Sequence, residues 1–110
     1  MSNSKVDGIS ERNIQHAIVA ILRWRGWMVR EISQPHRVSH DLVGVPDLIC
    51  FKNGITMLIE CKAKGGRLRD SQKQFAKDIT PHLRSTLWLI VADDVDAMIA
   101  KVDAIEGMAR

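Results

Sequence analysis

Residues 46–63 read PDLICFKNGITMLIECKA, two apolar runs joined at Asn53-Gly54. Asn-Gly between apolar runs is the strongest short-range signal of a β-hairpin closed by a two-residue turn. The residues on either side of such a turn pair with each other, and this pairing fixes the register of both strands. Extended outward, the register predicts Asp47 directly opposite Glu60, with Cβ atoms about 4.5–5.5 Å apart.

The hairpin also places three charged side chains on one face. Lys62 lies two residues after Glu60, and side chains alternate along a strand, so we expect both on the face that carries Asp47. The surrounding residues are apolar, as in a strand pair that is covered on both faces. Charges there repel each other and lose solvation unless a cation shares the site. The pattern predicts metal-dependent hydrolase chemistry. The alternative is a solvated hairpin edge with a simple ion pair.

A hard cation is the ligand that this arrangement favours. Magnesium takes oxygen ligands and is typically held by one or two carboxylates and a substrate phosphate. We expect oxygens from Asp47 and Glu60, with the backbone carbonyl of Cys61 as a third ligand. Lys62 is then close enough to position or deprotonate the attacking water, or to stabilise the charge of the transition state.

The rest of the chain alternates between helical and extended patterns. The expected elements are a helix from Ser10 to Gly26, a strand over 27–32, a loop over 33–44, strands over 46–51 and 56–63, a helix from Asp70 or Ser71 to Pro81, a strand over 86–91, and a helix from Asp93-Asp94 to Gly107. The last strand is almost continuously apolar, which predicts burial on both faces. A helix precedes it, so we expect it to run parallel to the strand before it. The order α-β-β-β-α-β-α predicts an α/β fold with a mixed central sheet flanked by helices.

Length and composition indicate one domain over residues 1–110, with residues 1–9 expected to be flexible. The chain is 45% hydrophobic and 26% charged, as is usual for a soluble globular protein. It shows no apolar segment typical of a signal peptide or membrane span. Cys50 and Cys61 are interpreted as small buried hydrophobes in a reducing compartment. We therefore expect a cytoplasmic or nuclear protein.

Positive charge is concentrated just after the strand that carries Glu60. The formal net charge is +3, which favours polyanion binding only weakly. The cations expected to bind DNA phosphates are Lys64, Arg67, Arg69 and Lys73. The alternative for such a run is a solvated surface.

Two polar residues continue the apolar stripes of predicted helices. Glu11 lies three residues before Ile14, and Gln72 lies three before Phe75, so both are expected to point inward. Gln72 begins a helix shortly after Glu60, and its side chain can reach the mouth of the same site. The alternative for both residues is a local role in capping or in complementing the helix dipole.

Together these motifs resemble the PD-(D/E)XK nuclease superfamily, and the fuller set is similar to its VRR-NUC branch in the minimal, stand-alone form carried by phages and bacteria. The matching residues are Glu11 with Ile14-Gln15, Arg25-Gly26-Trp27, Gly44-Val45-Pro46-Asp47-Leu48-Ile49, Ile59-Glu60-Cys61-Lys62, and Ser71-Gln72 with Phe75. The resemblance covers about residues 10–92. It implies a restriction-endonuclease-like core, dependence on Mg²⁺ or Mn²⁺, and phosphodiester hydrolysis in DNA. It also implies auxiliary site roles for Glu11 and Gln72.

Three functions fit the sequence. The favoured one is a metal-dependent, structure-selective DNA endonuclease that acts on branched or four-way junction DNA. A Holliday-junction resolvase is a close alternative, and a non-catalytic DNA-binding module that retains the fold is a distant one. We also expect a homodimer that presents two sites to branched DNA, with Trp24, Trp27 and Trp88 as candidate interface anchors.

Overall fold

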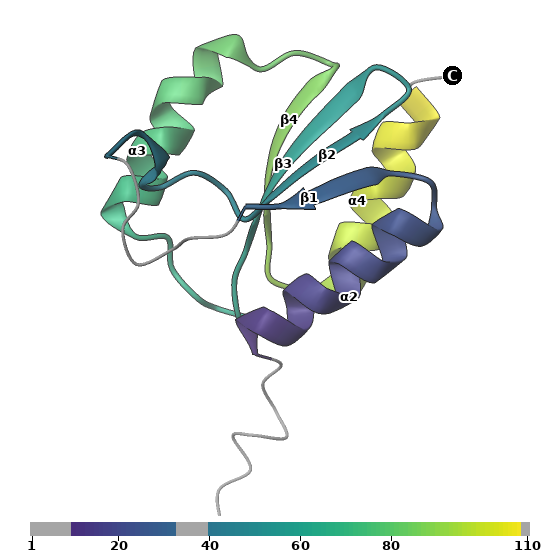
Figure 1. Ribbon diagram of the computed structural model, residues 1–110, viewed down its shortest axis with the longest axis horizontal. Coiled ribbons are helices and arrows are strands. Elements are labelled where there is room, and N and C mark those ends of the chain that lie inside the picture. The colour runs from purple at the N-terminus through teal and green to yellow at the C-terminus, as the bar shows by residue number, and fades with distance from the viewer. Residues whose placement is uncertain (1–9, 33–39, 109–110) are drawn as a thin grey trace, which may run out of the picture.

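The computed structural model describes residues 10–32 and 40–108, which form a four-stranded sheet with helices on both sides (Figure 1). In chain order the elements are α2 (Glu11–Trp24), β1 (Met28–Glu31), the 3₁₀ helix η1 (His40–Leu42), β2 (Leu48–Lys52), β3 (Ile55–Cys61), α3 (Asp70–Ile79), the 3₁₀ helix η2 (Thr80–His82), β4 (Leu87–Ala92) and α4 (Val95–Met108). The strand order is β1-β2-β3-β4, with β4 parallel to β3 and the other neighbours antiparallel. The expected α/β fold with a mixed sheet is confirmed.

The hairpin of β2 and β3 has the expected register. Asn53 and Gly54 adopt positive φ angles of 50° and 82°, as a two-residue hairpin turn that matches the strand twist requires. Leu48 pairs with Ile59. The next step of the register places residue 47 opposite residue 60, as predicted.

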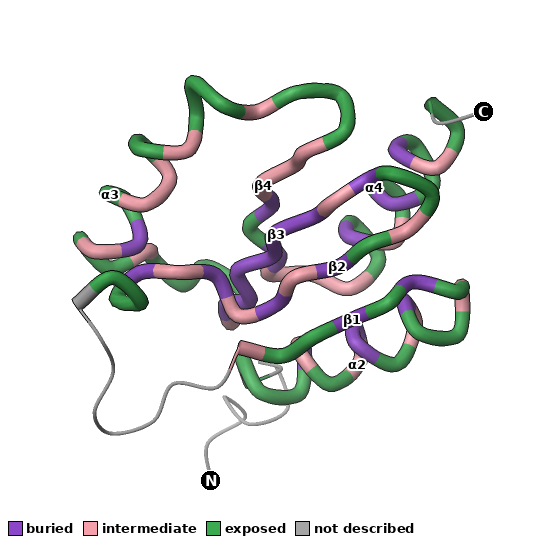
Figure 2. The backbone as a smooth tube through the Cα atoms, turned by 45° about the horizontal axis from the view of Figure 1, so that its top comes forward, coloured by how far each residue is buried: buried purple, intermediate pink, exposed green. Residues whose placement is uncertain are grey.

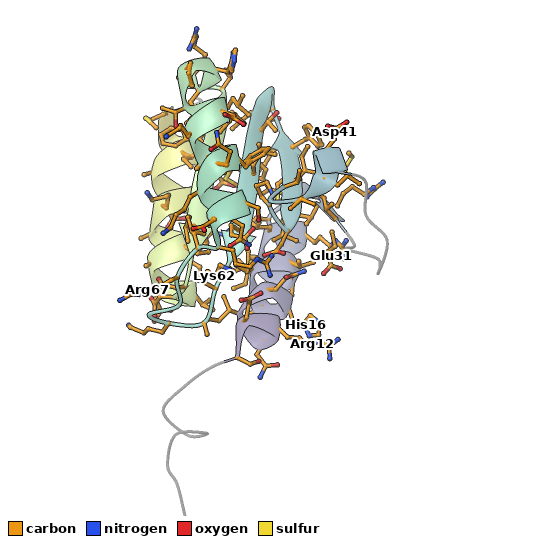
Figure 3. The ribbon with its side chains drawn as sticks, turned by 90° about the vertical axis from the view of Figure 1, so that its left-hand side faces the viewer. Arg12, His16, Glu31, Asp41, Lys62 and Arg67 are labelled. Atoms are coloured by element: carbon orange, nitrogen blue, oxygen red, sulfur yellow. The ribbon has the colours of Figure 1, made fainter. Side chains whose placement is uncertain are left out.

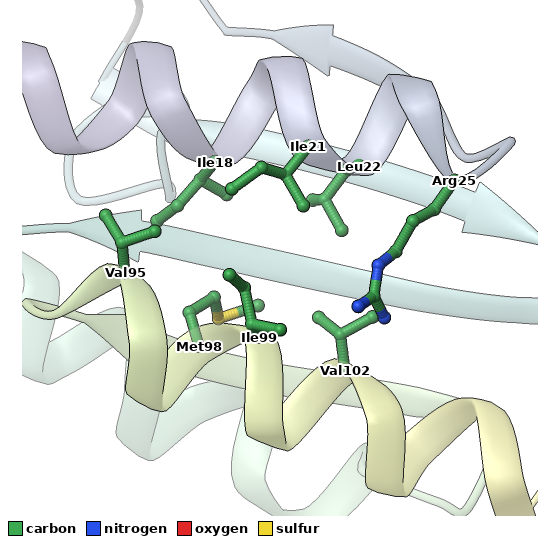
Figure 4. Close-up of a pocket in the computed structure, with 8 residues that line it drawn as sticks. All are labelled: Ile18, Ile21, Leu22, Arg25, Val95, Met98, Ile99 and Val102. Atoms are coloured by element: carbon green, nitrogen blue, oxygen red, sulfur yellow. The ribbon is translucent and has the colours of Figure 1, made fainter.

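Most of the core lies between the sheet and one helical layer. α2 and α4 lie together on one side of the sheet, and α3 lies on the other (Figure 1). Figure 4 shows apolar side chains of α2 and α4 facing each other, among them Ile18, Leu22, Met98 and Val102. Figure 2 shows that β3 is buried along most of its length, as expected for an inner strand.

An ion cluster joins α2, β2 and α4 at the hairpin-turn end of the molecule. Glu106 accepts hydrogen bonds from Trp27 Nε1 at 2.7 Å and from Lys52 Nζ at 3.1 Å. Lys52 Nζ also donates to the carbonyl oxygen of Arg25 at 2.7 Å, and the Arg25 guanidinium pairs with Asp103. Partial burial acts to raise the pKa of Glu106, but the hydrogen bonds from Trp27 and Lys52, with the positive charges of Lys52 and Arg25, outweigh burial and lower it.

The expectation for β4 is wrong in one respect. It runs parallel to β3 as predicted, but it is an edge strand, and Val91 on it is 48% exposed. An apolar run predicts that a strand is largely buried, but it does not specify whether the strand lies at the centre or at the edge of the sheet. β3, which has a strand on each side and helices over both faces, is the strand that meets the expectation.

Element ends differ from the sequence prediction by a few residues. β2 begins at residue 48 and β3 ends at residue 61, so both are shorter than expected at the site end. Ser10 caps α2 as predicted, accepting from the Asn13 N–H at 3.1 Å. Arg69 occupies the N-cap position of α3 in place of Asp70 or Ser71, and α4 continues past Gly107.

Some expectations fall on residues that the structure does not describe. They concern residues 1–9 and most of the loop predicted over 33–44, of which residues 40–42 form η1. Within the described ranges, no helix is long and apolar enough to cross a membrane.

The three tryptophans have different environments. Trp27 is buried, Trp88 is half-buried and donates to the Ser85 carbonyl, and Trp24 is 87% exposed. Only Trp24 therefore keeps the exposure expected of an interface anchor.

Candidate active site

The site lies at the end of β3 opposite the hairpin turn. Glu60 and Lys62 are 4% and 6% exposed, and Lys62 Nζ lies 3.6 Å from Glu60 Oε2. Their contact confirms that the two side chains share a face of the sheet. Lys62 follows the last residue of β3, and its N–H donates to the Ala92 carbonyl at 2.9 Å. β4 therefore fixes the backbone that carries the lysine.

Asp47 is held at the predicted position by bonds to both neighbouring segments. Its carbonyl accepts from the Ile32 N–H at 2.7 Å, and its Oδ2 accepts from the Cys61 N–H at 2.8 Å. The bond from Ile32 continues the ladder between β1 and β2 beyond Leu48, whereas the bond from Cys61 is made to the Asp47 side chain. The partner of Cys61 in this register is Pro46, which has no N–H to donate to the Cys61 carbonyl.

Burial dominates the electrostatics of Glu60. Desolvation, followed by the negative charge of Asp47, raises the pKa of Glu60 to about 7, although Lys62 acts in the opposite direction. Glu60 Oε2 accepts from Gln72 Nε2 at 2.6 Å. Glu60 Oε1 is buried and has no hydrogen-bond partner in the described structure. A buried oxygen of this kind is costly unless a ligand uses it.

Gln72 points into the site as predicted. It is 5% exposed, and its Oε1 accepts from the Arg69 N–H at 2.8 Å while its Nε2 binds Glu60. The side chain thus makes a capping contact and also contacts Glu60, two arrangements that were alternatives at the level of the sequence. The two bonds fix the orientation of the amide, because only its nitrogen can donate to the carboxylate.

Gly44 positions the start of α3, a role that sequence reasoning missed. Its φ angle is +87°, and a Cβ at this position would lie 2.2 Å from the carbonyl oxygen of Ser71. The segment before Asp47 therefore packs directly on the first turn of α3, next to Gln72. The sequence shows a glycine next to a motif, but not which backbone it contacts.

Glu11 differs from its prediction. Its side chain is exposed and does not join the inward stripe of α2. Its negative charge nevertheless contributes to the raised pKa values of Glu60 and Cys61, so it lies near the site. Glu11 is the first residue of α2, and the buried stripe of the helix begins one turn later, at Ile14.

The expected DNA-binding cations are on the surface beside the site. All four are exposed: Lys64, Arg67, Arg69 and Lys73. Lys64 Nζ lies 3.8 Å from Asp94, and the positive charge of Arg69 reaches Glu60. Figure 3 shows Arg67 at the outer side of the loop that follows Lys62.

The oxygen donors fit a hard divalent cation. Asp47 and Glu60 provide carboxylates, and the unpaired Oε1 of Glu60 is an available ligand atom. No cluster of three or more His, Cys, Asp or Glu side chains able to hold a metal occurs among residues 10–32 and 40–108. An ion with two carboxylates would thus take its other ligands from the backbone, water and substrate, as Mg²⁺ commonly does.

A family model of the VRR-NUC domain matches residues 10–103. The chain belongs to the VRR-NUC family. This confirms the resemblance that the sequence motifs carried, and VRR-NUC domains form a nuclease family, which implies DNA as the substrate. No curated protein and no solved structure matched the chain.

The raised pKa of Glu60 makes the stability of this VRR-NUC domain depend on pH. The pKa rises from 4.5 to about 7 on folding, so between these values the native state binds more protons than the unfolded state. The free energy of unfolding of metal-free protein should then fall as pH rises through this range. Glu60→Gln should be more stable than wild type at pH 8, by about 3 kcal/mol at about 1.4 kcal/mol per pH unit, and about equal near pH 4.

Urea denaturation in EDTA at both pH values measures this effect. Glu106→Gln is the matched control and should lose stability at pH 8, because hydrogen bonds from Trp27 and Lys52 lower the pKa of Glu106. If the difference in free energy of unfolding between Glu60→Gln and wild type were the same at pH 4 and pH 8, the raised pKa of Glu60 would be contradicted.

We expect Gly44→Ala to displace the start of α3. The control is Gly54→Ala, which has a similar φ of +82° but no atom within 4 Å of an added Cβ. The control should lose about 1–2 kcal/mol from backbone strain alone. Gly44→Ala should lose more, because the Ser71 carbonyl must move. Urea denaturation of both variants tests this, and equal losses would mean that the close approach is unimportant.

Proposed function

We propose that this protein is a metal-dependent, structure-selective DNA endonuclease that hydrolyses phosphodiester bonds, with branched or four-way junction DNA as substrate. The observation that carries the proposal is the buried, unpaired Oε1 of Glu60. It lies in a site that also contains the carboxylate of Asp47 and the ammonium of Lys62. Membership of a nuclease family supports the same conclusion.

Asp47 and Glu60 would hold Mg²⁺ or Mn²⁺, with the Cys61 carbonyl as the third protein ligand. The ion, when bound, would polarise the phosphoryl oxygen and lower the pKa of coordinated water. Its charge would also favour the ionised form of Glu60, whose pKa burial otherwise raises to about 7. The affinity for metal should therefore increase as pH rises through this region.

Lys62 and Gln72 would act on the reacting groups and on Glu60. The Lys62 ammonium can orient the attacking water or stabilise negative charge on the phosphoryl oxygens. The ion pair between Lys62 Nζ and Glu60 Oε2, at 3.6 Å, keeps the ammonium beside the carboxylate. Gln72 donates to the same oxygen and leaves Oε1 for the ion. Glu11 would have an auxiliary role through its charge.

The cations after Lys62 would bind the sugar–phosphate backbone. A surface made of Lys64, Arg67, Arg69 and Lys73 contacts phosphates without reading bases, which suits selection of DNA by shape. We also propose a homodimer, since two sites related by a two-fold axis suit a branched substrate. A cytoplasmic location is in keeping with the unpaired thiols of Cys50 and Cys61.

The second candidate function is a DNA-binding module without activity. Against it stands the cost of an unpaired buried carboxylate oxygen, which a purely structural site could relieve by a change to a neutral side chain. Cleavage of linear, flap and four-way DNA with Mg²⁺, Mn²⁺ or EDTA separates the candidates. Metal-dependent cleavage of branched substrates is expected. Binding without cleavage under every condition would overturn the endonuclease proposal, and equal cleavage of all substrates would overturn structure selectivity.

Loss of a charged group at the centre of the site should abolish cleavage. We expect Asp47→Ala, Glu60→Ala and Lys62→Ala each to lower the rate about 10³-fold, equivalent to about 4 kcal/mol of transition-state stabilisation. Glu11→Ala and Gln72→Ala should have milder effects. Circular dichroism controls for folding. The control variant is Lys101→Ala, which changes a residue of α4 on the opposite side of the sheet from the site and should retain the wild-type rate. Wild-type turnover by purified Glu60→Ala would rule out the mechanism.

The double variant Arg67→Ala/Arg69→Ala should weaken DNA binding about equally for all sequences. Backbone contacts release counterions, so the dependence of log affinity on log salt should become flatter by about 0.9 for each phosphate that the variant no longer neutralises. Fluorescence anisotropy of labelled DNA at several salt concentrations measures both quantities. Lys77→Ala, with its cation in the last turn of α3, is the control. If affinity and slope did not change in the double variant, the cluster would be a solvated surface.

A further inference from the structure

We propose that the free edge of β4 pairs antiparallel with β4 of a second copy of this chain, joining the two sheets into one. β4 is the last strand in the sheet order, and among the described residues β3 is the only strand that pairs with it; its other partner is a single bridge from Leu87 to Arg84. Its sequence, LWLIVA, contains no charge, proline or glycine. Proteins usually protect an edge strand with such residues, because an apolar edge recruits other strands.

The opposite edge of the sheet shows the contrast. β1 is only four residues long and carries the charged Arg30 and Glu31. Short length and charge are common ways of preventing edge-to-edge pairing. β4 has neither, and Val91 on it is 48% exposed. Hollows adjoin it on both sides: Leu89 and Val91 line one beside α3, and Ile90 to Asp94 line another beside α4.

Backbone hydrogen bonds identify the groups that are available. The carbonyls of Thr86 and Ala92 accept from the N–H groups of Thr56 and Lys62. Even-numbered residues of β4 therefore direct their backbone groups to β3, and odd-numbered residues direct theirs to the free edge.

Part of this edge is already occupied. Arg84 folds back beside Leu87 and bonds to both its N–H and its C=O, at 3.0 and 3.3 Å. The outward groups of Leu89 and Val91 remain unpaired within residues 10–32 and 40–108.

These two residues determine the register of the proposed pair. If Leu89 bonds Val91 of the second copy, symmetry makes Val91 bond Leu89 of the second copy, and the two-fold axis passes beside Ile90. All available edge groups are then used. Trp88 stands opposite the small Ala92 of the second copy, which leaves room for the indole.

The ends of the strand are complementary in charge. After Val91, the next residue whose backbone groups point to the free edge is Asp93. On the second copy, the position that faces Asp93 lies beside Leu87 and is occupied by Arg84. Asp93 is half-buried and has no bonded partner in the described structure. The pairing would bring each Arg84 close to an Asp93 at both ends of the strand pair.

This arrangement deepens the proposed function, on which its consequence for DNA rests. Glu60 is in register with Val91, so the two Glu60 residues would be three strand spacings apart and shifted by two residues. At about 4.8 Å per strand and about 3.3 Å per residue, they would lie about 16 Å apart. The axis is perpendicular to the sheet, so both sites would open on the same side, and one DNA molecule could meet both.

The first test needs no substitution, metal or DNA, so its outcome does not depend on nuclease activity. Light scattering should give about twice the chain mass of 12.4 kDa at high micromolar concentration. Amide hydrogen exchange of Leu89 and Val91 should slow as concentration rises, while that of Ile90, already bonded to β3, should not change. A chain that remains monomeric, or that dimerises without protecting these amides, would overturn the proposal.

Variants test the register. Val91→Pro removes an outward N–H without touching the β3 ladder and should give a monomer, whereas Val91→Thr should still dimerise. Arg84→Glu should raise the dimer dissociation constant about tenfold, since it places like charges together. Arg84→Glu/Asp93→Arg should restore it. Trp24→Ser should have no effect. If Trp24→Ser gave a monomer while Val91→Pro remained a dimer, the interface would lie at the end of α2 and the proposal would be wrong.

Discussion

A buried carboxylate is the constraint on which the rest of this structure depends. Glu60 lies on the most enclosed strand of the sheet, where loss of solvation and the nearby charge of Asp47 raise its pKa to about 7. The fold compensates with the ammonium of Lys62 and the amide of Gln72. These groups come from different segments, so the site exists only when β2, β3 and α3 are assembled.

The two faces of the sheet carry different kinds of side chain. The side covered by α2 and α4 contains nearly all of the apolar core. At the hairpin-turn end, Glu106 on α4 accepts hydrogen bonds from Lys52 on β2 and from Trp27, which lies between α2 and β1. The other side carries the charged site and α3. Unfavourable burial of charge is thus confined to a region that the apolar side stabilises, as is common when polar groups are buried for function.

Backbone chemistry matters as much as side chains at the site. Pro46 cannot donate to the Cys61 carbonyl, and Gly44 allows one backbone to approach another. Both lie in the segment that enters β2, just before Asp47. The short motif around Asp47 therefore specifies local geometry as well as a carboxylate, which is why its order and spacing carry more information than any of its residues alone.

The sequence by itself determined the hairpin register, the shared face of Glu60 and Lys62, and the order of helices and strands. It could do so because turn chemistry and the two-residue period of a strand are local rules. It also indicated the family, through the order and spacing of charged and apolar positions in its motifs. Tertiary structure alone decided the edge position of β4, the exposure of Glu11 and the contact of Gly44 with α3. Each depends on which segments meet across long stretches of chain, and an apolar run or a single glycine does not encode its partner. The unpaired oxygen of Glu60 belongs to the same class, because whether a carboxylate has a partner depends on every element packed around it.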